Sequence, residues 1–200
     1  MKIVFWGSTG SVPASLNAKA IRSKIFKAIE ASKDVELKTS QDIDNFIDES
    51  LPFSVKGTYG GNTSCVEVRD GNNFVIFDAG TGLRDLGNAL ISNQDKTSNF
   101  HIIISHVHWD HIQGLPFFGP LYLEGNEFDI YGGTSLPITI EEILHRQMSP
   151  PVFPVPMKTL HSTLRFHDQK SGDVIETDNC RISLISMYHP NGSYGYRFDS

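Results

Sequence analysis

The chain has 200 residues, of which 39% are hydrophobic and 20% charged, and this composition excludes an intrinsically disordered protein. Seventeen basic and 23 acidic residues give a formal charge of −6, and the basic residues are scattered, which disfavours a long nucleic acid as the main partner. Because we find no apolar run of about 18 residues and no signal-peptide pattern, we expect a soluble, cytoplasmic protein that does not bind a membrane.

The length favours a single domain over residues 1–200, and apolar periodicity with turn residues predicts its elements. In chain order, the patterns predict strand 2–6, helix 16–33, helix 41–49, strand 63–69, strand 74–78, helix 83–92, strand 101–105, strand 127–131, helix 139–148, and strands 163–167, 173–176, 181–188 and 193–198. Strands 63–69 and 74–78 form a predicted hairpin around the turn at 70–73. Because strands and helices interleave and a hairpin is present, we expect a layered α/β domain with mixed sheets.

Two glycine-rich segments interrupt these elements. Residues 7–11 follow the first strand, but no Walker lysine comes after them, so we interpret them as an ordinary loop. Residues 57–62 are too rich in glycine for a regular element, which predicts a loop that is mobile or that a ligand approaches.

The residues with the clearest chemistry form the sequence His-Val-His-Trp-Asp-His at 106–111, directly after the predicted strand 101–105. In an extended segment, residues two apart project to the same side, so His106 and His108 can bind one metal ion. As the chain then turns, Asp110 and His111 can bind a second ion about 3.5 to 4 Å away. Three imidazoles and a carboxylate crowded together need a cation to offset their desolvation, so the pattern predicts a metal site.

His189 is a further candidate ligand. It ends the apolar strand 181–188 and precedes Pro190, Asn191 and Gly192, so it lies where a rigid strand passes into a loop. We predict that it is the third ligand of the first metal. The other histidines stand alone in the sequence, and we expect them to be ordinary surface or packed residues: His101, His145, His161 and His167.

Together these segments resemble the metallo-β-lactamase-fold hydrolases, and within them the branch that contains tRNase Z-like and cyclic-nucleotide phosphodiesterase members. Besides the histidine motif and the strand-ending histidine, the resemblance rests on GGNTS at 60–64, DAGTG at 78–82, HWDHIQGLPFF at 108–118 and HPNG at 189–192. It covers nearly the whole chain. It implies a four-layer αββα sandwich with a dinuclear site for two Zn²⁺, or Mn²⁺, at one edge between the sheets.

By this resemblance, His106, His108 and His189 hold the first metal, and Asp110 and His111 hold the second. Family members also have an aspartate that bridges both metals and a later histidine. Only eleven residues follow His189, among them Asp199, which comes too early for the bridging position. The second metal site is therefore expected to be incomplete.

The same resemblance implies an αββα sandwich that lacks its C-terminal strands and helices. The chain is then a fragment of a longer protein, receives ligands from another chain, or has degenerated into a one-metal or inactive form; we favour a fragment. An open sheet edge usually has to be paired or covered, which favours association with a second copy as a homodimer.

The leading hypothesis for function is a metal-dependent phosphodiesterase that cleaves small, anionic, cyclic-nucleotide-like phosphodiesters. The metals would lower the pKa of a bound water to about 7, and the resulting hydroxide would attack phosphorus. Asp110 would act as the catalytic residue that orients this water or takes its proton. Two alternatives stay open: a metallohydrolase of a lactone, carboxylic ester or sulfate ester, and a catalytically inactive homologue that binds a metal or a nucleotide.

Further residues are candidates for contacts around the metals. Asp78 is a candidate for orienting a metal-binding histidine from behind. Residues of three loops are candidates for binding the substrate, the aromatic ones by stacking on a base: Asn62, Thr63, Ser64, Phe118 and Phe153.

Overall fold

The computed structural model describes residues 1–70, 73–92, 98–177 and 180–199, and its internal contacts divide the chain into two compact units. Unit 1 comprises Met1–Pro13 and Asn62–Ser200, and unit 2 comprises Ala14–Gly61. All the elements expected to build the metal site belong to unit 1. The single domain expected over residues 1–200 stays a prediction.

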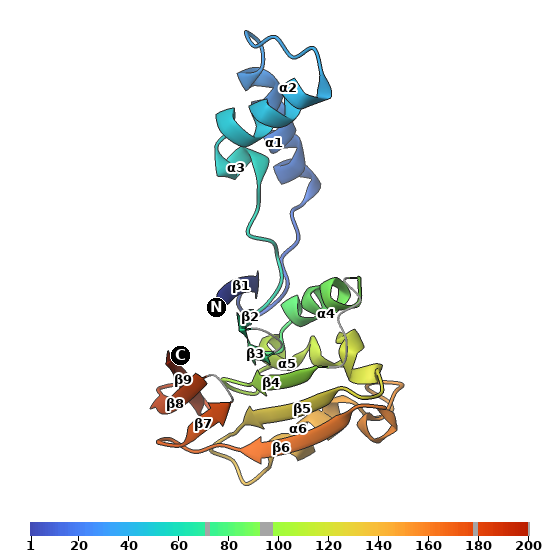
Figure 1. Ribbon diagram of the computed structural model, residues 1–200, viewed down its shortest axis with the longest axis vertical. Coiled ribbons are helices and arrows are strands. Elements are labelled where there is room, and N and C mark those ends of the chain that lie inside the picture. The colour runs from blue at the N-terminus through green and yellow to red at the C-terminus, as the bar shows by residue number, and fades with distance from the viewer. Residues whose placement is uncertain (71–72, 93–97, 178–179, 200) are drawn as a thin grey trace. The chain divides into compact units, whose positions relative to one another are not determined.

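A six-stranded sheet forms the centre of unit 1 (Figure 1). Its strands, in spatial order, are β1 (Lys2–Gly7), β2 (Cys65–Asp70), β3 (Asn73–Phe77), β4 (Asn99–Ile103), β5 (Glu127–Gly132) and β6 (Thr163–Asp168). The first three strands pair antiparallel, whereas β3, β4, β5 and β6 pair parallel. The predicted hairpin and mixed sheet are confirmed, although turn residues 71–72 lie outside the described residues.

Helices cover one face of this large sheet. They are α4 (Gly82–Ser92), the one-turn α5 (Trp109–Ile112) and α6 (Ile140–Gln147), with 3₁₀ turns at Leu115–Phe117, Gly119–Tyr122 and Met157–Thr159. Leu86 of α4 and Leu144 of α6 are fully buried in one cluster with Ile102 and Ile130 of the sheet. Each such side chain contributes about 1.5 to 3 kcal/mol through removal of its apolar surface from water.

A three-stranded antiparallel sheet packs on the other face of the large sheet. It consists of β7 (Val174–Thr177), β8 (Cys180–Met187) and β9 (Ser193–Asp199) in that order. Ile182 and Leu184 of β8 are buried in a second cluster with Val75 and Ile103 of the large sheet. Unit 1 therefore has a helix layer and two sheet layers of the expected αββα sandwich. In its described residues, no helix covers the outer face of the small sheet.

Unit 2 is helical and matches the two helices that the sequence predicts. It contains α1 (Ala18–Ala31), α2 (Ser40–Asn45), the π-helical turn η1 (Phe46–Ser50) and the short α3 (Phe53–Lys56), which was not predicted. The side chain of Asn17 caps α1, and Thr39 with Asp42 forms a capping box at α2. Among the described residues of the whole chain, no helix has both the length and the apolar character needed to cross a membrane.

The core of unit 2 is small. Of its large apolar side chains, Phe46 and Leu51 are buried. Ten others are exposed to solvent: Leu16, Ile21, Ile25, Phe26, Ile29, Val35, Ile43, Ile47, Phe53 and Tyr59. A unit of this size with so few buried apolar side chains gains little stability from its own core.

On the sheet face opposite the helices, an ion network joins β5 and β6. The carboxylate of Asp129 accepts hydrogen bonds from Arg165 at 3.0 Å and from His167 at 2.7 Å. Burial acts to raise the pKa of Asp129, but the hydrogen bonds from these two partners outweigh it and hold the pKa below its usual value. The network therefore stabilises the folded state while Asp129 is ionised.

We expect Asp129→Asn to lower the free energy of unfolding by about 1.5 to 3 kcal/mol at pH 7, the range for a hydrogen bond to a charged group. A carboxyl whose folded pKa is depressed stabilises the protein above its unfolded pKa of about 3.9, and this contribution is lost as the pH falls through the folded pKa. The difference between wild type and variant should therefore shrink below about pH 4. Urea denaturation at several pH values measures it.

The matched control is Glu127→Gln, which removes a more exposed partner of the same Arg165 and should cost less. A stability difference for Asp129→Asn that stays constant from neutral to acidic pH would contradict the proposed ionic origin.

Candidate metal centre

The loop that follows β4 carries the histidine motif and is anchored in both sheets. The Ile104 amide donates to the Tyr131 carbonyl of β5 at 2.8 Å, and the Ser105 carbonyl accepts from the Tyr194 amide of β9 at 2.9 Å. The Tyr196 hydroxyl also donates to the Ile104 carbonyl at 2.9 Å. The loop is therefore held at the edge where the two sheets meet, as the resemblance predicts.

Three histidines converge at this edge. One ring nitrogen from each of His106, His108 and His189 can be chosen so that all three lie within 4.8 Å of one another. Nδ1 of His108 and Nε2 of His189 are 3.1 Å apart. His106 and His108 lie on the extended segment before α5, and His189 follows the end of β8. The structure thus brings together the three residues that the sequence predicts as ligands of the first metal.

Asp110 and His111, the residues predicted for a second metal, lie beside this cluster. The rings of His106 and His111 are 4.0 Å apart, and His111 Nε2 is 3.4 Å from Asp110 Oδ2. The same oxygen of Asp110 accepts a hydrogen bond from the Ser11 amide at 2.8 Å. The loop at residues 7–11 therefore contributes a backbone donor to the metal centre, which its sequence did not reveal.

Asp78 lies behind the cluster and orients it. Its carboxylate accepts hydrogen bonds from His111 Nδ1 at 2.7 Å, from the Ser64 hydroxyl at 2.8 Å and from the Ser105 amide at 2.8 Å. Asp78 has a φ of +63°, a left-handed conformation that aspartate tolerates better than most residues. The structure thus places Asp78 where a residue that orients a histidine from behind would lie.

The electrostatics of the cluster suit a divalent cation. Burial, together with the neighbouring imidazoles of His111 and His189, lowers the pKa of His106 to about 4. His106 is therefore neutral at pH 7, the form in which imidazole binds metals. For Asp110, burial acts to raise the pKa, but the Ser11 amide and His111 outweigh it and lower the pKa, so a carboxylate is present. Imidazole nitrogens and a carboxylate are a donor set that fits Zn²⁺ or Mn²⁺.

The pKa of His111, unlike that of His106, is raised. Burial acts to lower its pKa, but the hydrogen bond and the charge of Asp78 outweigh burial and raise the pKa. The bond at Nδ1 occupies that nitrogen and leaves Nε2 on the side of Asp110. Asp78 therefore determines which nitrogen of His111 is available as a ligand.

Two of the predicted substrate-binding residues make hydrogen bonds within the protein. The Asn62 side-chain amide donates to Asp85 at 2.6 Å, and Thr63 is fully buried and exchanges hydrogen bonds with Thr81. Their polar groups are thus used within the protein, and the prediction that they contact substrate stays a prediction. Ser64 lies next to the cluster and reaches it through Asp78.

The structure also places the two phenylalanines that were predicted to stack on a base. Phe118 is fully buried, with its ring edge-to-face on Phe100 at 5.6 Å. Its stacking on a base stays a prediction, which this placement does not favour. Phe153 is half-buried and packs edge-to-face on Phe117 at 5.7 Å. The aromatic side chains exposed on these loops are Trp109 and Phe117. Sequence reasoning missed Trp109, although its place between two candidate ligands was a usable signal.

The described residues supply no further aspartate or histidine to a second site. Among them, the group of three or more potential ligands that can hold a metal is the one formed by His106, His108 and His189. In the register of β8 and β9, Met187 pairs with Ser193 near His189, whereas Asp199 pairs with Arg181 at the other end of the hairpin. Asp199 is therefore remote from the cluster, as the sequence predicts.

Comparison with known proteins relates this site to a group of hydrolases. No protein-family model matches the chain. The chain is 30% identical to ribonuclease Z of Methanothermobacter thermautotrophicus over 142 residues. The matched region covers 69% of this chain and 42% of that protein. The chain is 29% identical over 126 residues to ribonuclease Z of Prochlorococcus marinus, covering 61% and 38%. The chain thus spans about two fifths of the length of the curated relatives it matches.

Two solved structures share its fold. A diphosphatase of the PhnP family superposes with a TM-score of 0.57 at 18% identity, covering 99% of this chain and 62% of that one. The short form of human tRNase Z superposes with a TM-score of 0.54 at 17% identity, covering 100% and 64%.

The layered sheets, the histidine cluster at their common edge and these superpositions show that the chain has the metallo-β-lactamase fold. Its sequence relatives are ribonucleases Z, so it fits the tRNase Z-like branch of that fold, in agreement with the motifs of the sequence.

The amide of Ser11 offers a direct test of how Asp110 is held. Ser11→Pro removes the donor and is incompatible with the φ of +65° at this position, whereas Ser11→Gly keeps the donor and relieves the strain. We expect Ser11→Pro to weaken Zn²⁺ binding by about 10-fold, the lower end of the effect for partners of metal ligands. Competition with a chromophoric chelator measures the affinity.

Ser11→Gly should bind Zn²⁺ as wild type does, and thermal unfolding of both variants without metal checks that the fold is retained. Equal affinities for Ser11→Pro and wild type would show that this hydrogen bond does not position Asp110.

Proposed function

We propose that the protein containing this chain is a metal-dependent hydrolase that cleaves phosphodiester bonds. The observation that supports this most strongly is the convergence of His106, His108 and His189, with Asp110 and His111 beside them. The three histidines would hold one Zn²⁺ or Mn²⁺. Asp110 and His111 would contribute to a second ion, for which the described residues offer an incomplete set of ligands.

A bound divalent cation would supply Lewis acidity toward a phosphoryl oxygen and would lower the pKa of water. Asp110 is ionised and is held by the Ser11 amide, so it can accept a proton from an attacking water molecule. The hydrogen bond from His111 to Asp78 keeps the His111 ring oriented toward Asp110. Asp78, Ser64 and Ser105 thus hold the reacting groups in place without touching the substrate.

Several observations bear on the substrate class. The relatives are named ribonucleases Z and one structural neighbour is named a diphosphatase, and reactions at phosphorus are therefore favoured over those at carbon or sulfur esters. The chain carries a formal charge of −6 with scattered basic residues. Because long RNA requires many basic contacts, we favour a small phosphodiester such as a cyclic nucleotide over RNA.

A substrate panel tests this proposal. Protein loaded with Zn²⁺ or Mn²⁺ is incubated with 3′,5′-cyclic nucleotides, an aryl phosphodiester and an RNA with a 3′ extension. We expect turnover of the small phosphodiesters, and we expect His108→Ala to lower it by more than about 100-fold, because even partners of metal ligands cost up to that amount. The matched control is His161→Ala, which alters an exposed histidine outside the cluster and should leave the rate unchanged.

Faster cleavage of RNA than of every small phosphodiester would overturn the preference for small substrates. Binding of nucleotides without product formation by the metal-loaded protein would instead identify a catalytically inactive homologue.

A further inference from the structure

His189 reaches the histidine cluster from an exposed turn between β8 and β9. His189 and its neighbours Tyr188 and Pro190 are all exposed to solvent, whereas His106 is largely buried. The ring of His189 lies near those of His106 and His108, with centroids 4.5 and 4.9 Å away. Its place in the cluster is therefore determined by the backbone of the turn more than by packing around its side chain.

The turn has a defined local shape. The Gly192 amide donates to the His189 carbonyl at 3.1 Å, which closes a four-residue β-turn. Pro190 and Asn191 are its central residues, and Asn191 has a φ of +64°. A proline followed by a residue with positive φ defines a type II turn. The turn sequence thus determines the path of the backbone, but not how the turn is oriented toward the large sheet.

Two donors from the loop after β5 hold the carbonyl oxygen of Asn191. The Thr134 hydroxyl and the Ser135 amide both donate to it, each at 3.1 Å. The Thr134 hydroxyl oxygen also accepts a hydrogen bond from the Leu136 amide at 3.2 Å. Because a hydroxyl can donate one proton and accept as well, the Thr134 side chain satisfies both contacts at once. The turn of the small sheet is thereby tied to the large sheet.

The loop that supplies these donors has a packed support. Gly132, which ends β5, and Gly133 are both buried, and a Cβ added at Gly133 would lie 2.6 Å from the Gln169 carbonyl oxygen. The Tyr194 hydroxyl of β9 donates to the same carbonyl at 2.9 Å. The backbone that leads to Thr134 is therefore fixed between the two sheets, and it can serve as a reference for the exposed turn.

We propose that Thr134 is a positioning residue of the metal centre, which acts on His189 through the carbonyl of Asn191. Ser135 contributes its backbone amide, which almost any residue would supply, so the contribution that depends on side-chain identity is the Thr134 hydroxyl. This role rests on the metal centre of the proposed function and is independent of the substrate. Groups that orient a ligand contribute to metal affinity although they do not touch the ion.

The Zn²⁺ affinity of the full 200-residue chain, measured by competition with a chromophoric chelator, tests this role. Thr134→Val removes the hydroxyl and should weaken binding by about 10-fold, the lower end of the effect for partners of metal ligands. Thr134→Ser keeps the hydroxyl and should bind Zn²⁺ as wild type does. The control is Thr159→Val, which removes a similar bond, to the Pro156 carbonyl at 2.7 Å, outside the histidine loops. It should leave the affinity unchanged.

A double-mutant cycle separates positioning of His189 from a general effect on the fold. In His189→Ala the turn has no ligand to direct, so adding Thr134→Val should cause no further loss of Zn²⁺ affinity. The visible absorption of bound Co²⁺ gives a second readout. The spectrum of Thr134→Val should move toward that of His189→Ala, and Thr134→Ser should keep the wild-type spectrum. Thermal unfolding without metal checks that each variant is folded.

Equal Zn²⁺ affinities for Thr134→Val and wild type would overturn the proposal. An equal loss of affinity from Thr134→Val in the wild-type and His189→Ala backgrounds would overturn it too, because the effect would then not pass through His189. Failure of the metal centre itself gives a different result. His189→Ala would then bind Zn²⁺ as tightly as wild type, which would overturn the ligand assignment of the proposed function and this positioning role with it.

Discussion

The carboxylate of Asp78 connects the segments from which the metal centre is built. It accepts hydrogen bonds from Ser64 before β2, from Ser105 after β4 and from His111 in α5. Because Asp78 is largely buried, each of these bonds forms in a medium where an unpaired partner would be costly. One carboxylate therefore determines both the path of the histidine loop and the orientation of His111, and the arrangement of the other histidines depends on that loop.

Much of this arrangement can be predicted from local sequence. His106 and His108 lie on an extended segment, so their spacing of two residues suffices to place both side chains on one side. His189 follows the apolar strand β8, whose alternating buried residues include Ile182 and Leu184. Rigid strands hold these positions, and long-range contacts enter mainly by bringing the two strand ends together.

Other features depend on packing that no local pattern encodes. Phe117 and Phe118 are adjacent in one sequence, yet Phe118 is buried on Phe100 and Phe117 is exposed, because the 3₁₀ turn directs them to opposite sides. The helical spacing of Ile21 and Ile25 predicts an amphipathic helix correctly. It does not tell which side of α1 meets the rest of unit 2, and the structure gives that place to Ala20, Lys24 and Ala28.

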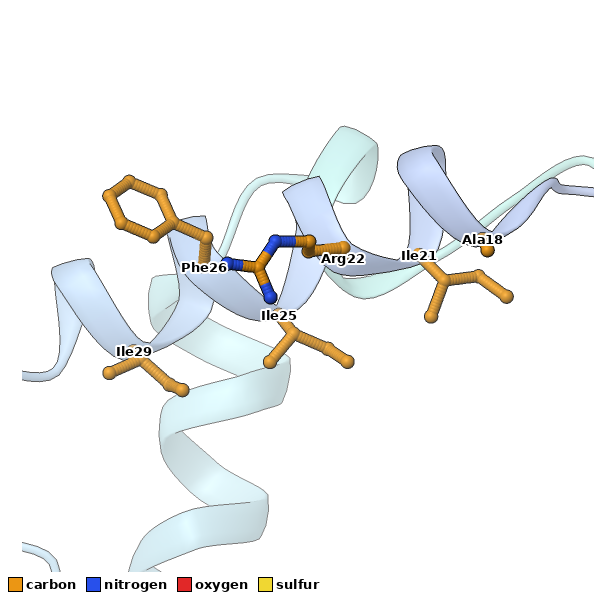
Figure 2. Close-up of a pocket in the computed structure, with 6 residues that line it drawn as sticks. All are labelled: Ala18, Ile21, Arg22, Ile25, Phe26 and Ile29. Atoms are coloured by element: carbon orange, nitrogen blue, oxygen red, sulfur yellow. The ribbon is translucent and has the colours of Figure 1, made fainter.

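The candidate metal centre and the exposed apolar side chains of α1 lie in different units. Every residue of the metal centre lies in unit 1, and none lies within residues 14–61. The exposed apolar side chains of α1 (Figure 2) lie wholly in unit 2. Substitutions there change none of the candidate metal ligands and none of the residues that hydrogen-bond to Asp78.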